Sequence, residues 1–279
     1  MAQTTDPAED RPRADLLAPG VIVLRQAVRA TFRALIAEVP AILRVERGQK
    51  VLRGAVQAVV PQGALVLIPA HLPLDVENHP GTDGTYRATA LLLSAAVPGP
   101  RGPSSATWCD DPRALAAFDR ALALQRSVSV PQPLRDHAVA EVLLWLDAAG
   151  LRLPPDAAPT LADRVRRITG AALDRPWRAA EVARTLAMSE ATLRRKLAAE
   201  GQGWADLLAD QRMCRALGLL QTTRLSVGVI AAEVGYTSAS RFAVRFRARF
   251  GISPGVIRKA DRNGRKIDRL GPTQALAAE

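Results

Sequence analysis

The chain has 279 residues, a length that predicts two domains, because one hydrophobic core rarely serves so many residues. Apolar residues make up 48% and charged residues 23%, the usual proportions of a folded soluble protein, which excludes a largely disordered chain. The apolar runs are far shorter than the roughly 20 residues that span a bilayer, and the first residues lack the pattern of a signal peptide. We therefore expect a cytoplasmic protein with no membrane partner.

The net charge of +11 is concentrated in one part of the chain. Residues 1–160 hold 16 basic and 16 acidic side chains, whereas residues 161–260 hold 18 basic and 8 acidic, an excess of 10. Such an excess favours a polyanion as the partner, because each phosphate neutralised by Lys or Arg releases bound counterions. An anionic membrane surface could use the same charge, so the residue pattern has to decide between the two.

After an N-terminal tail, residues 1–20, the segment 21–100 contains short runs of β character separated by Gly, Pro and Asn. These runs predict a small β-barrel or sandwich as the first domain. The runs that stand out are ILRVERG, VLRGAVQAVVP, GALVLIP, LPLDVEN and RATALLLSAAV.

Residues 101–160 are predicted to hold a linker and two helices. Asp111 and Pro112 form a helix start that is followed by apolar residues at helical spacing, and a second helix runs from about Leu134 to Ala149. We expect an antiparallel pair whose apolar faces serve either the domain core or a homodimer interface. The Pro-rich stretch 151–159 then marks the domain boundary.

Residues 179–200 have the pattern of a helix-turn-helix unit. A short helix and a tight turn precede Ser189, an N-cap residue, and Leu193 and Leu197 give the second helix a buried stripe. The side chains that point away from this stripe or flank it are Ala191, Thr192, Arg194 and Arg195.

Residues 227–250 repeat this pattern in the same register. Ser238 takes the place of the N-cap, and Phe242 and Phe246 form the buried stripe. A helix predicted over residues 204–221 connects the two units. The outward or flanking side chains of the second unit are Ser240, Arg241, Val244 and Arg247.

Three segments in this part of the chain, MSEATLRRKL, RMCRALGLL and LSVGVIAAEVGYTSASRFAVRFRARFGISPGVIRK, resemble the AraC/XylS family of bacterial regulators in order and spacing. The resemblance covers residues 161–260. It implies an all-α domain that binds double-stranded DNA through the outward residues of both units, with RNA polymerase as a second partner and activation as the usual role. The chain departs from the family at Val244, where many relatives are basic, and at Ile257, where an aromatic residue is common. Arg194 and Arg195 are therefore expected to carry more of the specificity than the second unit.

The segment GALVLIP and the later Asn78 resemble the second cupin motif, which implies a cupin-like sensor domain. The histidine of that motif is replaced by Leu74, and no HxH pair lies upstream. His71, Glu77 and His79 could ligate a cation, but three polar residues beside a turn are more often exposed to solvent. We expect no metal, no cofactor and no catalytic residue, and two reduced thiols at the distant cysteines.

The sequence thus predicts the α+β class: an N-terminal cupin-like β-barrel with a helical pair, then an all-α double helix-turn-helix domain and a tail, residues 261–279. The predicted function is sequence-specific transcription regulation, with a small molecule or protein as the effector of the N-terminal domain. Two other hypotheses stay open. A cupin-type metalloenzyme tethered to DNA requires bound metal, and a nucleoid-type structural protein would bind DNA without sequence preference. A merely solvated basic face is the alternative for the outward arginines.

Overall fold

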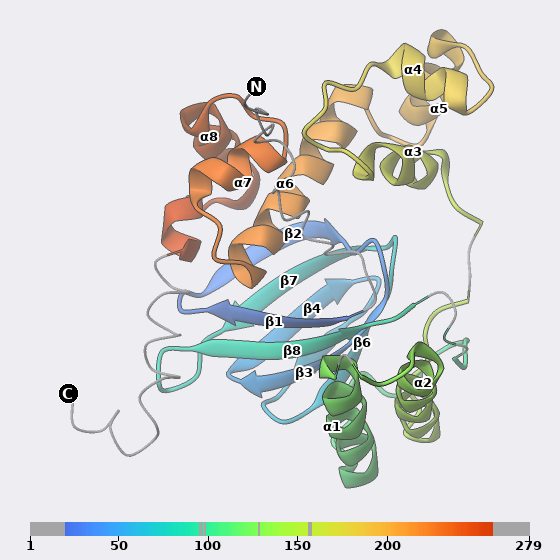
Figure 1. Cartoon of the computed structure of the whole chain (residues 1–279), viewed down its shortest axis with the longest axis vertical. Coiled ribbons are helices and arrows are strands. Elements are labelled where there is room, and N and C mark those ends of the chain that lie inside the picture. The colour runs from blue at the N-terminus through green and yellow to red at the C-terminus, as the bar shows by residue number, and fades with distance from the viewer. Residues whose placement is uncertain (1–19, 95–96, 98, 128, 156–157, 259–279) are drawn as a thin grey trace, which may run out of the picture.

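The computed structural model describes residues 20–94, 97, 99–127, 129–155 and 158–258. The predicted tails therefore lie outside the described residues, apart from Gly20. The α+β class is confirmed: a β-domain with a helical pair precedes an all-helical region (Figure 1). No helix in the described part of the chain is both long and apolar enough to span a bilayer.

Eight antiparallel strands form two four-stranded sheets, with the orders β1-β8-β3-β6 and β2-β7-β4-β5 (Figure 1). Alternation along the strands divides their side chains between two cores. In β3, Leu43 and Val45 enter the core between the sheets, whereas Ile42 points to the other face. The strands are β1 (Val21–Gln26), β2 (Ala30–Ile36), β3 (Ala41–Arg47), β4 (Gln49–Gly54), β5 (Ala58–Val60), β6 (Leu65–Ile68), β7 (Pro73–His79) and β8 (Tyr86–Leu92).

The five predicted runs correspond to strands β3 to β8, and the second run contains both β4 and β5. The first two strands were not singled out. Strand β2 breaks the period of two with a bulge between Phe32 and Leu35, where Ala34 has a φ of +49°. The strands pair as two separate sheets among the described residues, so the β-domain is an open form of the expected barrel.

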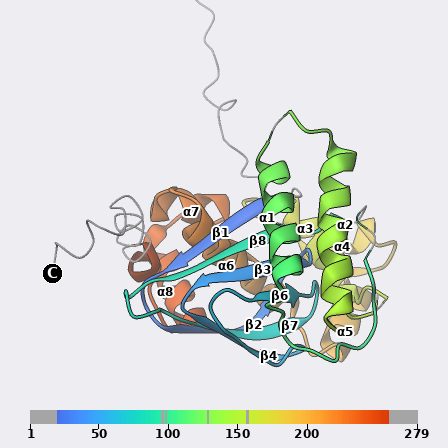
Figure 2. The ribbon, with the colours of Figure 1, turned by 90° about the horizontal axis from the view of Figure 1, so that it is seen from below.

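The predicted helical pair covers the outer face of the first sheet. Helices α1 (Pro112–Arg126) and α2 (Gln132–Ala148) lie side by side across it, as Figure 2 shows. The Asp111 side chain caps α1, and Phe118 and Leu146 are fully buried in one core with residues of the sheet. This core buries apolar faces of α1 and α2, for which the sequence analysis allowed either the domain core or a homodimer interface.

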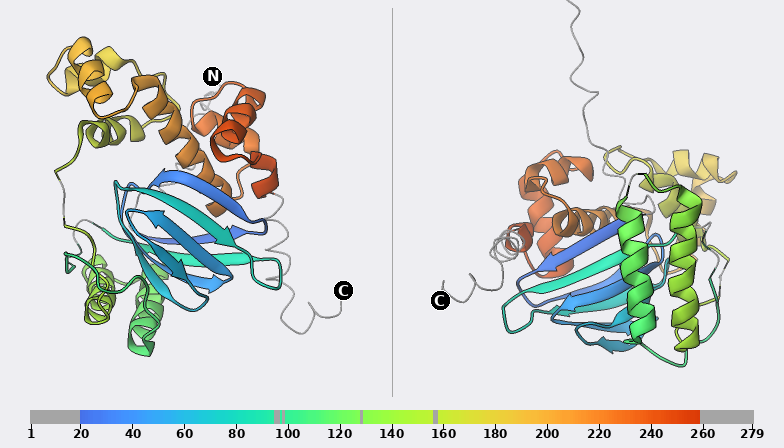
Figure 3. Two further views of the ribbon diagram at one scale, coloured as in Figure 1. Left: turned by 180° about the vertical axis from the view of Figure 1, so that it is seen from behind. Right: turned by 60° about the horizontal axis from the view of Figure 1, so that its bottom comes forward.

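Six helices form the C-terminal region, and α6 runs through its length (Figure 3). Leu207 near the start of α6 packs in one core with α3 to α5, whereas Ala216 and Leu220 pack in a second core with α7 and α8. Helix α3 was not among the predicted elements. The six helices are α3 (Leu161–Gly170), α4 (Ala179–Thr185), α5 (Glu190–Ala199), α6 (Trp204–Thr222), α7 (Val227–Glu233) and α8 (Ala239–Phe250).

The second of these cores is shared with the β-domain. Phe32 of β2 is 1% exposed, and its ring meets the ring of Phe250 edge-on at 5.7 Å between centroids. Ala30 of β2 belongs to the same core. The β-domain and the last helix pair are therefore one hydrophobic unit, although about 200 residues separate them in the sequence.

We predict that Phe32→Ala destabilises the protein by about 3 to 5 kcal/mol, the usual cost of deleting a buried phenyl ring. Because the ring lies in the shared core, amide protection of α7 and α8 should fall together with that of β2 in hydrogen-exchange measurements. Phe118→Ala is the matched control, since it opens only the core beneath α1 and α2. Unchanged protection of α7 and α8 in Phe32→Ala would contradict the shared core.

Candidate DNA-binding interface

Both predicted helix-turn-helix units are present, and each second helix begins at the expected serine. Ser189 Oγ accepts a hydrogen bond from the Thr192 backbone at 3.2 Å, and Ser238 Oγ accepts one from the Arg241 backbone at 3.3 Å. The leucine stripe of α5 and the phenylalanine stripe of α8 are buried, which fixes the outward face of each helix.

On α5 the outward residues are not equivalent. Ala191, Arg194 and Arg195 are exposed, and Thr192 is half-buried. The Arg194 guanidinium binds one carboxylate oxygen of Glu190 through Nε at 2.9 Å and through Nη2 at 2.8 Å. Arg195 makes no such contact within the described part of the chain, so its guanidinium is available to a ligand without exchanging a partner.

On α8 all four predicted outward residues are exposed, and Val244 has 72% of its surface accessible. The same helix carries one arginine with a different role. Arg249 binds Asp210 of α6, and its Nη2 donates to the Ala34 carbonyl of the β-domain at 3.3 Å. The outward residues Ser240, Arg241, Val244 and Arg247 have no hydrogen-bond or ion-pair partner for their side chains among the described residues.

Helices α5 and α8 sit at opposite ends of α6 (Figure 3). A helix of 19 residues is about 28 Å long, close to the roughly 34 Å between successive major grooves on one face of DNA. Because both cores include α6 side chains, this helix fixes the separation of the units.

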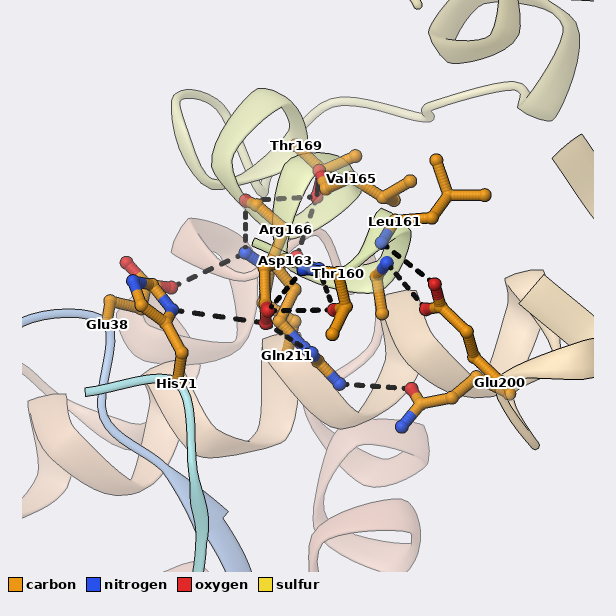
Figure 4. A network of polar contacts seen from close by, with 12 residues as sticks. Glu38, His71, Thr160, Leu161, Asp163, Val165, Arg166, Thr169, Glu200 and Gln211 are labelled. Carbon is orange, nitrogen blue, oxygen red and sulfur yellow. Dashed lines mark hydrogen bonds and ion pairs between the residues drawn. The ribbon is translucent and has the colours of Figure 1, made fainter. Parts of the chain in front are cut away.

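A polar network holds α3 against α5 and α6 (Figure 4). Asp163 and Thr160 form a capping box at the start of α3, and Glu200 accepts hydrogen bonds from two further backbone N–H groups there, at 2.9 and 3.0 Å. Arg166 binds Asp163 at 3.2 Å and donates to the Gln202 side chain at 3.0 Å. The start of α3 is therefore tied to the segment that follows α5.

The β-domain reaches the same network through two residues that Figure 4 labels. The Gln211 side chain donates to the Arg166 carbonyl at 2.7 Å and to Glu38 Oε1 at 3.4 Å. His71 Nδ1 lies 4.0 Å from Asp163 Oδ1. A change in the β-domain loops that carry Glu38 and His71 would thus act directly on the helix that packs under the first unit.

The three residues considered for a cation do not converge. Glu77 binds Arg29 and Arg53, and Arg29 lowers the pKa of this carboxyl group. His79 lies 3.2 Å from Glu77, whereas His71 faces Asp163. No group of three His, Cys, Asp or Glu side chains within the described ranges could hold a metal ion.

The two cysteines are free thiols that lie in different parts of the fold. Cys109 is buried beside the first sheet, and burial raises its pKa. Burial also raises the pKa of Cys214 in α6, to about 12. Both thiols are therefore protonated at neutral pH, which makes them poor nucleophiles.

A second polar connection runs from inside the β-domain to α6. Lys50 is 3% exposed, and its Nζ donates to Asn78 Oδ1 at 2.7 Å. Asn78 donates to Gln26 Oε1 at 3.1 Å, and Gln221 of α6 donates to the same oxygen at 3.4 Å. Asn78, which the sequence placed at the end of a cupin motif, is therefore a link between the two domains. Burial lowers the pKa of Lys50 to about 7.

Comparison with known proteins matches the C-terminal part of the chain to a known type of domain. A family model described as a helix-turn-helix domain matches residues 182–260. The regulator GadX of Escherichia coli is 31% identical over 121 residues, 43% of either chain, and SirC of Salmonella typhimurium is 37% identical over 95 residues, 34% of this chain and 32% of SirC. The matched segments thus span less than half the length of these curated relatives, all of which are named as transcriptional regulators.

A solved structure shows a similar fold over more of the chain. ToxT of Vibrio cholerae, bound to an unsaturated fatty acid, aligns with a TM-score of 0.60 over 84% of this chain and 92% of its own, at 12% identity. This likeness concerns the fold, in which a β-domain precedes a region with two helix-turn-helix units. Residues 182–260 therefore match the helix-turn-helix domain of these curated regulators, in agreement with the AraC/XylS resemblance of the sequence.

Some of these residues could have been found in the sequence and others could not. Thr160 and Asp163 have the spacing of a capping box, a local signal for the missed start of α3. No local signal links Glu38 to Gln211 or Gln26 to Gln221, because each pair is joined only by the docking of one domain on the other.

We predict that Lys50 makes folding stability depend on pH. An unfolded lysine titrates near 10.4, so between about pH 7 and 10 the unfolded chain binds a proton that the folded chain does not. This proton should make stability rise with pH by about 1.4 kcal/mol per unit in that window, whereas below it the slope is zero and the cost of burying the charged Lys50 is fully present. Lys50→Met should remove the slope in urea denaturation series and raise stability at pH 7.

Lys196→Met, at an exposed position on α5, is the control and should leave the slope unchanged. Identical pH profiles for Lys50→Met and the unmodified protein would show that the Lys50 ammonium is solvated in the folded state.

Proposed function

We propose that the protein is a sequence-specific transcription regulator that places α5 and α8 in successive major grooves of double-stranded DNA. The observation that carries this proposal is the pair of capped helices with exposed basic faces at the two ends of α6. The basic excess of residues 161–260 supplies the attraction to phosphate that such a domain needs.

The outward residues divide between base reading and phosphate contact. Arg195 is the strongest candidate for reading guanine, because a guanidinium without a partner can form two hydrogen bonds to O6 and N7 of that base. Arg194 would have to break its ion pair with Glu190 to contact DNA. The loss of this ion pair reduces the net binding free energy that Arg194 contributes. Ala191 and Thr192 let the helix approach the groove closely.

The N-terminal domain modulates this binding in our proposal. A cavity of about 610 Å³ lies between the domains, and its walls include His71 and Ile36 on one side and Asp163, Arg245 and Arg249 on the other. An effector that prefers one arrangement of these walls would shift the orientation of the two units. The ToxT structure, which carries a bound fatty acid, supports a small molecule as the effector.

Activation through RNA polymerase is the proposed outcome of DNA binding. Its support is the relative FapR of Escherichia coli, a transcriptional activator 31% identical over 97 residues. The two other hypotheses have direct tests. Metal analysis of the purified protein decides on a tethered metalloenzyme, and competition by unrelated DNA decides on a nucleoid-type protein.

We predict that Arg195→Ala weakens binding to a selected site by about 1 to 3 kcal/mol and binding to random DNA much less, because it removes a base contact. The site comes from selection of genomic fragments by the full-length protein at about 0.15 M salt. Arg126→Ala removes the same charge from α1 and is the control. Equal losses on selected and random DNA would assign Arg195 to phosphate contact.

We further propose that α2 forms a homodimer interface. Leu144 and Leu134 are 62% and 57% exposed on this helix, whereas Val139, Val142, Leu143 and Leu146 are buried in the core that α2 shares with α1 and the sheet. Leu144→Asp should convert a dimer into a monomer in sedimentation at tens of micromolar. Val59→Asp, at an equally exposed position on β5, should leave the dimer intact, and a monomeric unmodified protein would remove the proposal.

A further inference from the structure

Helix α8 carries a row of uncharged side chains along the middle of its outward face. Ser240, Val244 and Ala248 are spaced four residues apart, and all three are exposed. At about 100° per residue, Val244 lies almost opposite the centre of the buried phenylalanine stripe. With 72% of its surface accessible, it is the most exposed large apolar side chain in the described part of the chain.

Arginines border this row on both sides. Arg241 and Arg247 flank Val244, and Arg245 lies further round the helix; all three are exposed. No acidic residue occurs between positions 234 and 260, so nothing in the helix itself offsets this positive charge. The face that presents Val244 therefore suits a polyanion and would repel a basic or neutral apolar partner.

The folded protein itself gives no reason for a valine at this position. Valine is a weaker helix former than alanine, and most of the Val244 surface is exposed, so its methyl groups bury little apolar area in the folded protein. A surface that binds DNA does provide a partner. The C5-methyl group of thymine is the apolar feature that a base edge presents in the major groove.

We propose that Val244 is a specificity-determining residue that selects thymine through contact between its isopropyl group and the C5-methyl group of the base. The inference rests on the proposed function and adds the chemistry of the second half-site. Arg241 and Arg247 bind phosphates on either side of the groove, and the short side chains of Ser240 and Ala248 let the helix come near enough for methyl contact.

The two recognition helices then read DNA by different chemistry. Arg195 of α5 selects a base with two hydrogen-bond acceptors, whereas Val244 of α8 selects a base with a methyl group. The selected site should therefore contain a guanine in one element and an essential thymine in the other, about one helical turn apart.

The test replaces each thymine of the selected site in turn by deoxyuridine, which lacks only the C5-methyl group. For the unmodified full-length protein, deoxyuridine at one position in the α8 element should weaken binding by about fourfold, the factor that corresponds to one buried methyl group. Val244→Ala should bind the thymine site with a similar loss, and it should show no further loss on deoxyuridine at that position.

Val229→Ala is the matched control, because Val229 is an exposed valine on the neighbouring helix α7. It should retain the full deoxyuridine effect. If Val244→Ala keeps the same sensitivity as the unmodified protein at every thymine, the assignment of Val244 is overturned while the regulator proposal stands. If selection yields no preferred sequence, the proposed function itself fails, and this inference fails with it.

Discussion

Burial of both ends of one helix is the constraint on which the rest of this structure depends. Helix α6 contributes Leu207 to the core of the first helix-turn-helix unit and Ala216 and Leu220 to the core of the second. Rotation of α6 by one residue would remove both sets from their cores at once. The distance and orientation between the recognition helices are therefore set by packing, which is stiffer than a flexible linker.

The β-domain is joined to the C-terminal helices by three different kinds of contact. Phe32 provides apolar contact with the second unit, Gln26 provides an amide hydrogen bond to α6, and Glu38 provides a carboxylate next to the network under the first unit. The two polar contacts lie at separate points along α6, whereas the Phe32 ring meets Phe250 of α8. A ligand in the cavity between the domains could strengthen one and weaken another, which would tilt the units relative to each other.

Helices α5 and α8 differ in how many of their outward side chains already have a partner. On α5 an internal ion pair holds Arg194, whereas the outward side chains of α8 have no such partner among the described residues. An ion pair between exposed side chains contributes little to stability, so it can be exchanged for phosphate at small cost. Val244 has no ion pair to exchange for phosphate. Any free energy that it contributes to binding has to come from apolar surface that it buries against the partner.

The sequence by itself determined the local features of this protein. Apolar residues that recur every two or nearly every four positions predicted six of the strands and seven of the helices. Serine caps predicted where α5 and α8 begin. Motif spacing also gave the AraC/XylS resemblance and the outward residues of α5 and α8. Each of these features depends on residues a few positions apart, where steric fit and backbone hydrogen bonding act along the chain.

Only the tertiary structure decided how the two halves are joined. The role of Phe32 in a core of the DNA-binding domain could not be inferred, because an apolar residue in a strand has the same pattern whatever covers it. The same is true of the buried Lys50 and of Gln221, whose partners come from distant parts of the chain. The physical reason is that burial and polar pairing between domains depend on which surfaces meet, and no local spacing records that choice.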